Sequence, residues 1–123
     1  MVFINAINIR QPEFFDWAFN ETRGSPIQAI WDKIPSEVDI LITHGPVLGY
    51  GDRCRGGNRA GCYNLLETMK NRLTRCRAHI AGHIHEDYGV FTDGYRLYVN
   101  ASICNLRYQP FNAPIVFDFP LPS

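Results

Sequence analysis

Short apolar runs separated by polar turns dominate the pattern of this sequence. Residues 38–42 and 78–81 are compact, mainly apolar runs, which predicts strands that are buried on both faces of a sheet. Apolar residues recur between them at helical spacing, at Cys62, Leu65, Leu66, Met69 and Leu73. A strand, a helix and a strand in this order predict a parallel unit, whose two strands end at the same edge of the sheet.

The first third of the chain predicts one further strand and one further helix. Residues 2–9 alternate bulky apolar residues with Asn, which favours a strand. Ser25 as N-cap and Pro26 in the first turn predict a helix that continues to Ile34, and Pro35 ends it. An aromatic cluster precedes this helix and is interpreted as a satellite of the core rather than a ligand platform: Phe14, Phe15, Trp17 and Phe19.

The last third predicts a hairpin and a final strand. Residues 88–92 and 96–101 flank Asp93 and Gly94, a pair typical of a tight hairpin turn. Residues 115–119 form another apolar run, which predicts the last strand. The alternation of strands and helices predicts an α/β fold, with α+β as the neighbouring class.

Composition narrows the class of protein. A chain of 123 residues with 46% hydrophobic residues is long enough for one globular domain and too short for two. Twelve basic residues balance twelve acidic ones, so no net field favours a nucleic-acid polymer or an anionic membrane. The four cysteines form no Cys-x-x-Cys pair, and no apolar stretch is as long as a membrane span. We therefore expect a cytoplasmic protein with free thiols.

Three histidines follow the two predicted buried strands. His44 comes directly after residues 38–42, and His83 and His85 come directly after residues 78–81. Neutral imidazole is a common ligand of first-row metals, and parallel strands end at one edge of a sheet. The three imidazoles are therefore candidate metal ligands. His79 lies inside the second strand, where a hydrogen-bonded structural role is favoured over metal binding.

Other polar residues near these segments have two possible roles. Arg53, Arg55 and Arg59 lie in the glycine-rich loop after His44, where they could bind a phosphate group or form a solvated loop. Asn100 could fix a turn or support the metal ligands. Glu86 could orient an imidazole or lie on the surface as an ordinary carboxylate.

Five motifs together resemble the calcineurin-like metallophosphoesterases. They are DILITHGPVLGYGD at residues 39–52, NRAGCYNLL at 58–66, AGHIHEDYG at 81–89, DGYRLYVNASIC at 93–104 and NAPIVFDF at 112–119. The similarity is greatest to the metallophosphoesterase-domain-containing branch and covers nearly the whole chain. It implies that residues 1–123 are the carboxyl-terminal half of a four-layer αββα sandwich.

The resemblance also implies a chemistry. His44 and His83 would bind one divalent metal ion and His85 a second, drawn from manganese, iron and zinc. Water activated by the two ions would hydrolyse a phosphomonoester or phosphodiester of a small molecule, possibly a nucleotide. The Asp-x-His, Gly-Asp-x-x-Asp and Gly-Asn-His motifs of the family are absent, so no catalytic residue is assigned in this chain.

The absent aspartates leave three interpretations. The chain is part of an active enzyme, which we favour, or a truncated non-catalytic metal-binding, phosphate-binding or interaction module, or it pairs with a chain that supplies the other half. Imidazoles alone cannot hold two cations close together, so we expect this chain by itself to bind at most one ion, weakly. An exposed sheet edge would also favour self-association.

Overall fold

Five strands form a mixed sheet in a computed structural model that describes residues 1–6, 11–12 and 20–120. Their spatial order is β1 (Ile4–Ala6), β4 (Ile40–Ile42), β5 (Ala78–Ala81), β7 (Leu97–Asn100) and β6 (Gly89–Thr92). Neighbouring strands are parallel from β1 to β7, and β6 runs antiparallel to β7. The predicted α/β class and the predicted hairpin are therefore confirmed.

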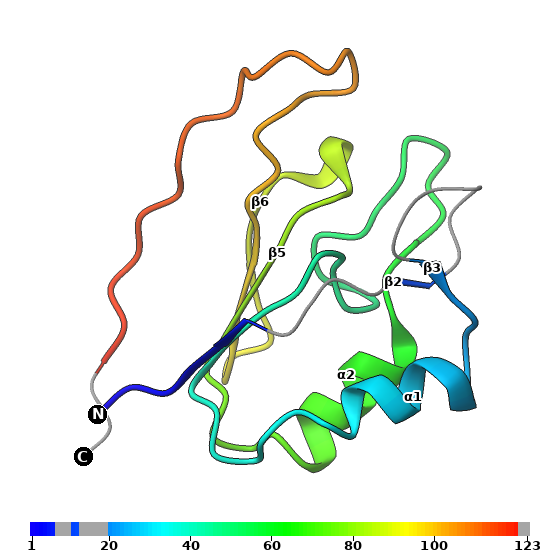
Figure 1. Cartoon of the computed structure of the whole chain (residues 1–123). Coiled ribbons are helices and arrows are strands. Elements are labelled where there is room, and N and C mark those ends of the chain that lie inside the picture. Colours follow the sequence, from blue (N-terminus) through cyan, green and yellow to red (C-terminus); the bar gives the residue numbers. More distant parts are fainter. Residues whose placement is uncertain (7–10, 13–19, 121–123) are drawn as a thin grey trace.

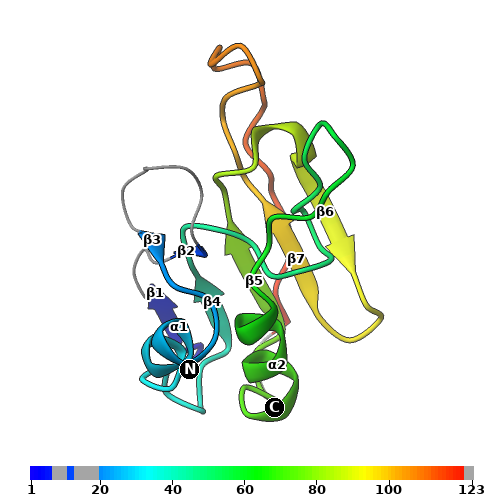
Figure 2. The same ribbon diagram turned by 90° about the vertical axis from the view of Figure 1, so that its right-hand side faces the viewer.

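Two helices cover one face of this sheet (Figures 1 and 2). They are α1 (Ser25–Trp31) and α2 (Tyr63–Asn71), and a short 3-10 helix, η1 (His85–Asp87), follows β5. Two short strands, β2 (Gln11–Pro12) and β3 (Asn20–Glu21), pair with each other in a separate ladder. Because α2 connects β4 to β5, the ends of these two parallel strands meet at one edge, as predicted.

The helix-covered face contains the main core. Leu41, His79 and Tyr98 are neighbours across β4, β5 and β7, and each is at most 1% exposed. They pack under α1 and α2, whose inward side chains Ile27, Trp31, Leu65 and Met69 are equally buried. We call this the covered face of the sheet.

The other face of the sheet is less well covered, and we call it the open face. Ile42, Ile80, Val99 and Val90 are neighbours across it, and Val90 is 50% exposed. The carboxyl-terminal tail runs along this side, opposite the helices (Figures 1 and 2, orange to red). The predicted strand at residues 115–119 is wrong: within the described part of the chain this segment forms neither strand nor helix, because it joins no ladder.

Element boundaries differ slightly from the predictions. Gly24, with φ 87°, is the N-cap of α1, so Ser25 is the first helical residue and not the cap. Cys62 caps α2, its Sγ accepting the N–H of Leu65 at 3.4 Å. The aromatic cluster and the second half of the predicted strand 2–9 lie outside the described residues. None of the helices described is long and apolar enough to cross a membrane.

Candidate metal centre

His44 and His83 lie side by side just beyond the ends of β4 and β5. Their ring centroids are 4.8 Å apart and the rings are tilted by 43°. The backbone sets this approach, because the N–H of Thr43 donates to the carbonyl of Ile80 at 3.0 Å and the N–H of Gly82 donates to that of His44 at 2.9 Å. The parallel pairing thus continues past both strands and brings the two imidazoles together.

The backbone of His83 adopts an uncommon conformation. Its φ of 71° lies in the left-handed region, where a side chain with a Cβ is disfavoured. Among the described non-glycine residues, Tyr108 is the other with a positive φ. Such residues often occur at functional sites, where the surrounding structure holds them in place.

Both imidazoles of this pair favour the neutral form. Burial lowers the pKa of His44. The pKa of His83 is lowered to about 4, mainly by burial and also by the positive charges of protonated His44 and His85, while the Glu86 carboxylate opposes the shift. A neutral imidazole keeps one nitrogen lone pair, which is the form that binds a metal ion. At neutral pH the pair is therefore ready to act as a metal ligand.

His85 is held in a defined tautomer beside the pair. Its Nδ1 lies 3.2 Å from the carbonyl oxygen of Asn105, and its ring meets the Tyr108 ring at an edge, with centroids 5.2 Å apart. A carbonyl only accepts hydrogen bonds, so Nδ1 carries a proton, and in the neutral ring Nε2 then keeps the lone pair. Ligating histidines commonly use their second nitrogen in this way.

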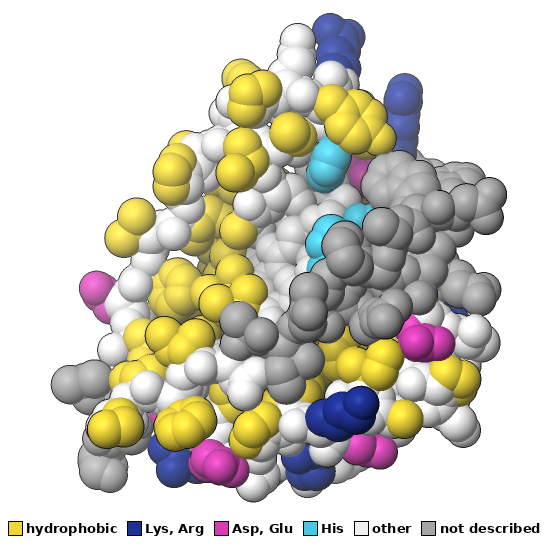
Figure 3. Space-filling model, viewed as in Figure 1, with side chains coloured by type: hydrophobic (Ala, Val, Ile, Leu, Met, Phe, Trp, Pro, Cys, Tyr) yellow, Lys and Arg dark blue, Asp and Glu magenta, His cyan; other side chains and the backbone are white. Residues whose placement is uncertain are grey.

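The three histidines do not form a finished metal cage. Within the part of the chain that the structure describes, no group of three or more His, Cys, Asp or Glu side chains is arranged to hold a metal ion. The structure thus brings the rings of His44 and His83 together, and His85 follows His83 in the same segment, at the start of η1. Histidine side chains reach the surface on the face seen in Figure 3 (cyan), near apolar side chains.

Asn100 connects the two segments that follow the strands. Its buried amide donates to the carbonyls of Gly51 at 2.9 Å and Ile84 at 2.7 Å. Its oxygen accepts the N–H of Ser102 at 3.0 Å and the hydroxyl of Ser102 at 2.8 Å. Asn100 therefore fixes the backbone between His83 and His85 against the loop that follows His44.

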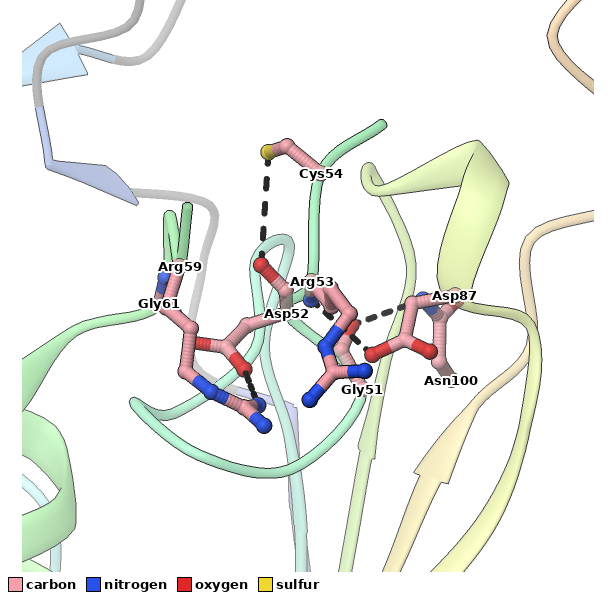
Figure 4. A network of polar contacts seen from close by, with 8 residues as sticks. All are labelled: Gly51, Asp52, Arg53, Cys54, Arg59, Gly61, Asp87 and Asn100. Carbon is pink, nitrogen blue, oxygen red and sulfur yellow. Dashed lines mark hydrogen bonds and ion pairs between the residues drawn. The ribbon is translucent and has the colours of Figure 1, made fainter. Parts of the chain in front are cut away.

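The predicted phosphate-binding arginines differ in their surroundings. Arg59 forms an ion pair with the buried Asp52 at 2.7 Å, so its charge is largely neutralised (Figure 4). Arg53 and Arg55 have exposed side chains on the same loop.

The two carboxylates that directly follow His85 hold the loop of Arg53 and Arg55 in place. Asp87 and Glu86 accept the backbone N–H groups of Arg53 and Arg55, each at 2.9 Å. Figure 4 shows the first of these contacts. The Glu86 carboxylate thus anchors the loop backbone, and its negative charge also acts on His83, whose pKa it raises against the other contributions. Asp52 shapes the same loop from inside by accepting the N–H of Gly61 at 3.1 Å.

Sequence reasoning missed two contacts of this region. The carbonyl of Asn105 orients His85, but a backbone carbonyl leaves no signal in a sequence. The hydroxyl of Thr43 lies 2.8 Å from Nε2 of His79, a contact that the side-by-side pairing of β4 and β5 creates. The sequence offers one signal for this contact: a polar residue, Thr43, follows one predicted strand, and a histidine, His79, lies inside the next.

Comparison with known proteins finds relatives over most of the chain. No family model matches it. Metallophosphoesterase domain-containing protein 1 of Homo sapiens is 51% identical over 113 residues, or 91% of this chain, and its Mus musculus counterpart gives the same values. A UPF0046 protein of Caenorhabditis elegans is 45% identical over 111 residues. The chain spans 34% of the length of the two mammalian relatives and 28% of the nematode one.

Proposed function

We propose that this chain, a relative of the metallophosphoesterase domain-containing proteins, forms the carboxyl-terminal part of a metal-dependent phosphoesterase. The proposed reaction is the hydrolysis of a small phosphomonoester or phosphodiester, possibly a nucleotide. The observation that carries the proposal is the close approach of His44 and His83. Their ring centroids are 4.8 Å apart, at the carboxyl ends of the parallel strands β4 and β5. Open α/β sheets commonly bind their ligands at this edge.

The residues present fit a divalent metal ion in part. Neutral imidazoles suit manganese, iron or zinc, and the lowered pKa values of His44 and His83 keep these rings neutral. A bound divalent ion would supply Lewis acidity toward a phosphoryl oxygen. Three imidazoles without a carboxylate favour one weakly held ion, so the proposal needs carboxylates from another part of the enzyme for a second ion.

The other site residues have distinct proposed roles. His85 would offer Nε2 as a ligand, because the carbonyl of Asn105 occupies its Nδ1 proton. Arg53 and Arg55 would attract the phosphate group, since both side chains are exposed. Asn100 would keep the histidine-bearing segments in place through its bonds to Gly51 and Ile84.

An activity comparison tests the proposal. The chain alone and a longer polypeptide, in which the preceding segment of the human relative is joined to it, are assayed on an activated aryl phosphodiester with Mn²⁺. We expect hydrolysis by the longer form, and its loss after His83→Ala or His44→Ala. Tyr63→Phe in α2, where the side chain is 55% exposed, is the control and should keep full activity. A folded longer form without hydrolysis would rule the proposal out.

A second candidate function is an interaction module that self-associates through its exposed sheet edge. The half-exposed Val90 on the edge strand β6 favours it. Sedimentation velocity at increasing protein concentration tests this candidate, and Val90→Lys should shift any dimer toward monomer. A monomer at every concentration would exclude it. We also propose a cytoplasmic location, which the four free cysteine thiols support.

A further inference from the structure

A buried hydrogen-bond chain links the middle of β5 to the turn that carries His44. His79 is 1% exposed, and its Nε2 lies 2.8 Å from Oγ1 of Thr43, which is itself 6% exposed. The same Oγ1 donates to the carbonyl oxygen of Gly45 at 2.7 Å. The side chain of β5 thus reaches the backbone of residues 43–46 through a single hydroxyl group.

The direction of each hydrogen bond follows from the chemistry of the groups. A hydroxyl has one hydrogen, and the carbonyl of Gly45 can only accept. The 2.7 Å contact therefore uses the hydrogen of Thr43, and the Thr43 oxygen must accept from His79. It follows that Nε2 of His79 carries the proton, which defines one neutral tautomer.

Hydrogen bonds hold the backbone on both sides of His44. The bond from Thr43 to the Gly45 carbonyl spans the residue between them, and the carbonyl of His44 accepts the N–H of Gly82 at 2.9 Å. The turn around His44 is therefore tied to β5 at two positions, one through the side chain of His79 and one through the backbone. This turn carries the backbone from which the His44 ring projects toward the His83 ring.

We infer that His79 is a positioning residue for His44: by donating from Nε2 to the Thr43 hydroxyl, it fixes the turn that presents the His44 imidazole to His83. The inference rests on the proposed function insofar as His44 is a metal ligand. A histidine that is 1% exposed needs a polar partner for its ring nitrogen, and the Thr43 hydroxyl supplies one. This assigns to a buried strand residue a role in the geometry of the site.

Nuclear magnetic resonance of the metal-free chain tests the geometry directly. Imidazole ¹⁵N spectra should show His79 protonated at Nε2 and unprotonated at Nδ1. Thr43→Val, which removes the hydroxyl but keeps the shape, should shift and broaden the ring signals of His44, whereas Thr43→Ser should restore them. A proton on Nδ1 of His79, or His44 signals unchanged by Thr43→Val, would overturn the inference.

Metal affinity supplies a second readout. We expect the Mn²⁺ or Zn²⁺ affinity to fall by about tenfold in His79→Leu and in Thr43→Val, the usual effect of losing a group that orients a ligand. His79→Gln retains an N–H near Nε2 and should recover most of the loss. Ile27→Val, on the buried side of α1, is the control for destabilisation alone and should keep the affinity of the original chain.

The two readouts separate this inference from the proposed function. If the original chain binds neither ion, the metal site fails, while the ring signals of His44 still decide whether His79 positions it. If the original chain binds metal and the affinities of His79→Leu, His79→Gln and Ile27→Val are equal, the positioning role fails and the metal site stands.

Discussion

The two faces of the sheet are built from the same strands but have very different surroundings. On the covered face, Leu41 and Tyr98 are at most 1% exposed, under the two helices. On the open face, Ile42 is 36% exposed, Val90 50% and Ile4 59%. Leu41 and Ile42 are consecutive in β4, and successive side chains of a strand point to opposite faces of the sheet. One residue along the strand therefore separates a buried position from a partly exposed one. The chain completes one packing interface and leaves the second only partly covered.

The difference also affects the chemistry of polar groups. Burial on the covered face lowers the pKa of His79 to about 3, with a further contribution from the positive charge of Arg96. Burial on the same face raises the pKa of Tyr98 to about 12. Both groups stay neutral near pH 7, so the covered face holds polar side chains without burying a charge at these positions.

The largest expected effect is between β4 and α2, where two backbone segments touch. A Cβ added at Gly61 would lie 2.2 Å from the backbone oxygen of Val47, and neither group can move without breaking the pairing of Val47 with Cys62. We expect Gly61→Ala to destabilise the fold by about 4 kcal/mol or more, measured by urea denaturation.

Gly94→Ala is the control for this substitution. Gly94 has φ 89° in the hairpin between β6 and β7, with no atom within 4 Å of an added Cβ. It should cost about 1 to 2 kcal/mol from backbone strain alone. Equal costs for the two glycines would mean that the segments of Gly61 and Val47 are further apart than described.

The next effect compares neighbouring residues on opposite faces. Leu41→Ala removes a fully buried side chain and should cost about 3 kcal/mol, because it leaves a cavity under the helices. Ile42→Ala removes a side chain that is already 36% exposed and should cost about 1 kcal/mol. Thermal and urea unfolding measure both values. If Ile42→Ala costs as much as Leu41→Ala, the open face is packed in solution.

Acid sensitivity is a smaller effect that depends on the covered face. The folded chain keeps His79 neutral down to about pH 3, whereas the unfolded chain takes up a proton below the usual pKa of 6.5. Between these values the unfolded state binds more protons, so stability is complete above pH 6.5 and falls as the pH decreases. From pH 7 to pH 5 the loss from His79 is about 2 kcal/mol.

Comparing His79→Gln with the original chain isolates the part of the acid-induced loss of stability that is due to His79. His44 and His83 also have lowered pKa values and destabilise the fold in acid, but they are present in both proteins. We therefore expect the free energy of unfolding to fall less steeply with decreasing pH in His79→Gln. Parallel curves for the two proteins would show that His79 does not remain neutral in the fold.

The covered face could be predicted from the sequence, and the open face could not. The runs 38–42 and 78–81 and the helical spacing from Cys62 to Leu73 carry the information for strands β4 and β5, helix α2 and their parallel arrangement. These features are local, so hydrophobic periodicity reveals them. Residues 115–119 have an equally apolar pattern, yet a strand also needs a neighbour to pair with, and pairing is not a local property.

The same distinction applies to the candidate site. The motifs around His44 and His83 predicted their approach, because parallel strands bring their ends together. The roles of Glu86 and Arg59 could not be predicted, since they depend on contacts across loops: one anchors the backbone of Arg55 and the other pairs with Asp52. Loop contacts have no periodic pattern, so the sequence shows the residue types but not their partners.

The smallest expected effect is on the open face itself. Val90 is 50% exposed in β6, and Val90→Thr keeps a β-branched side chain of similar size. Its hydroxyl can remain in water, so we expect the free energy of unfolding to change by less than about 0.5 kcal/mol. Val99→Thr, the neighbour across the ladder at 4% exposure, would bury the same hydroxyl and should cost about 1 to 3 kcal/mol. A large cost at Val90, equal to that at Val99, would mean that another polypeptide segment covers β6 in solution, and the contrast between the two faces would then be lost.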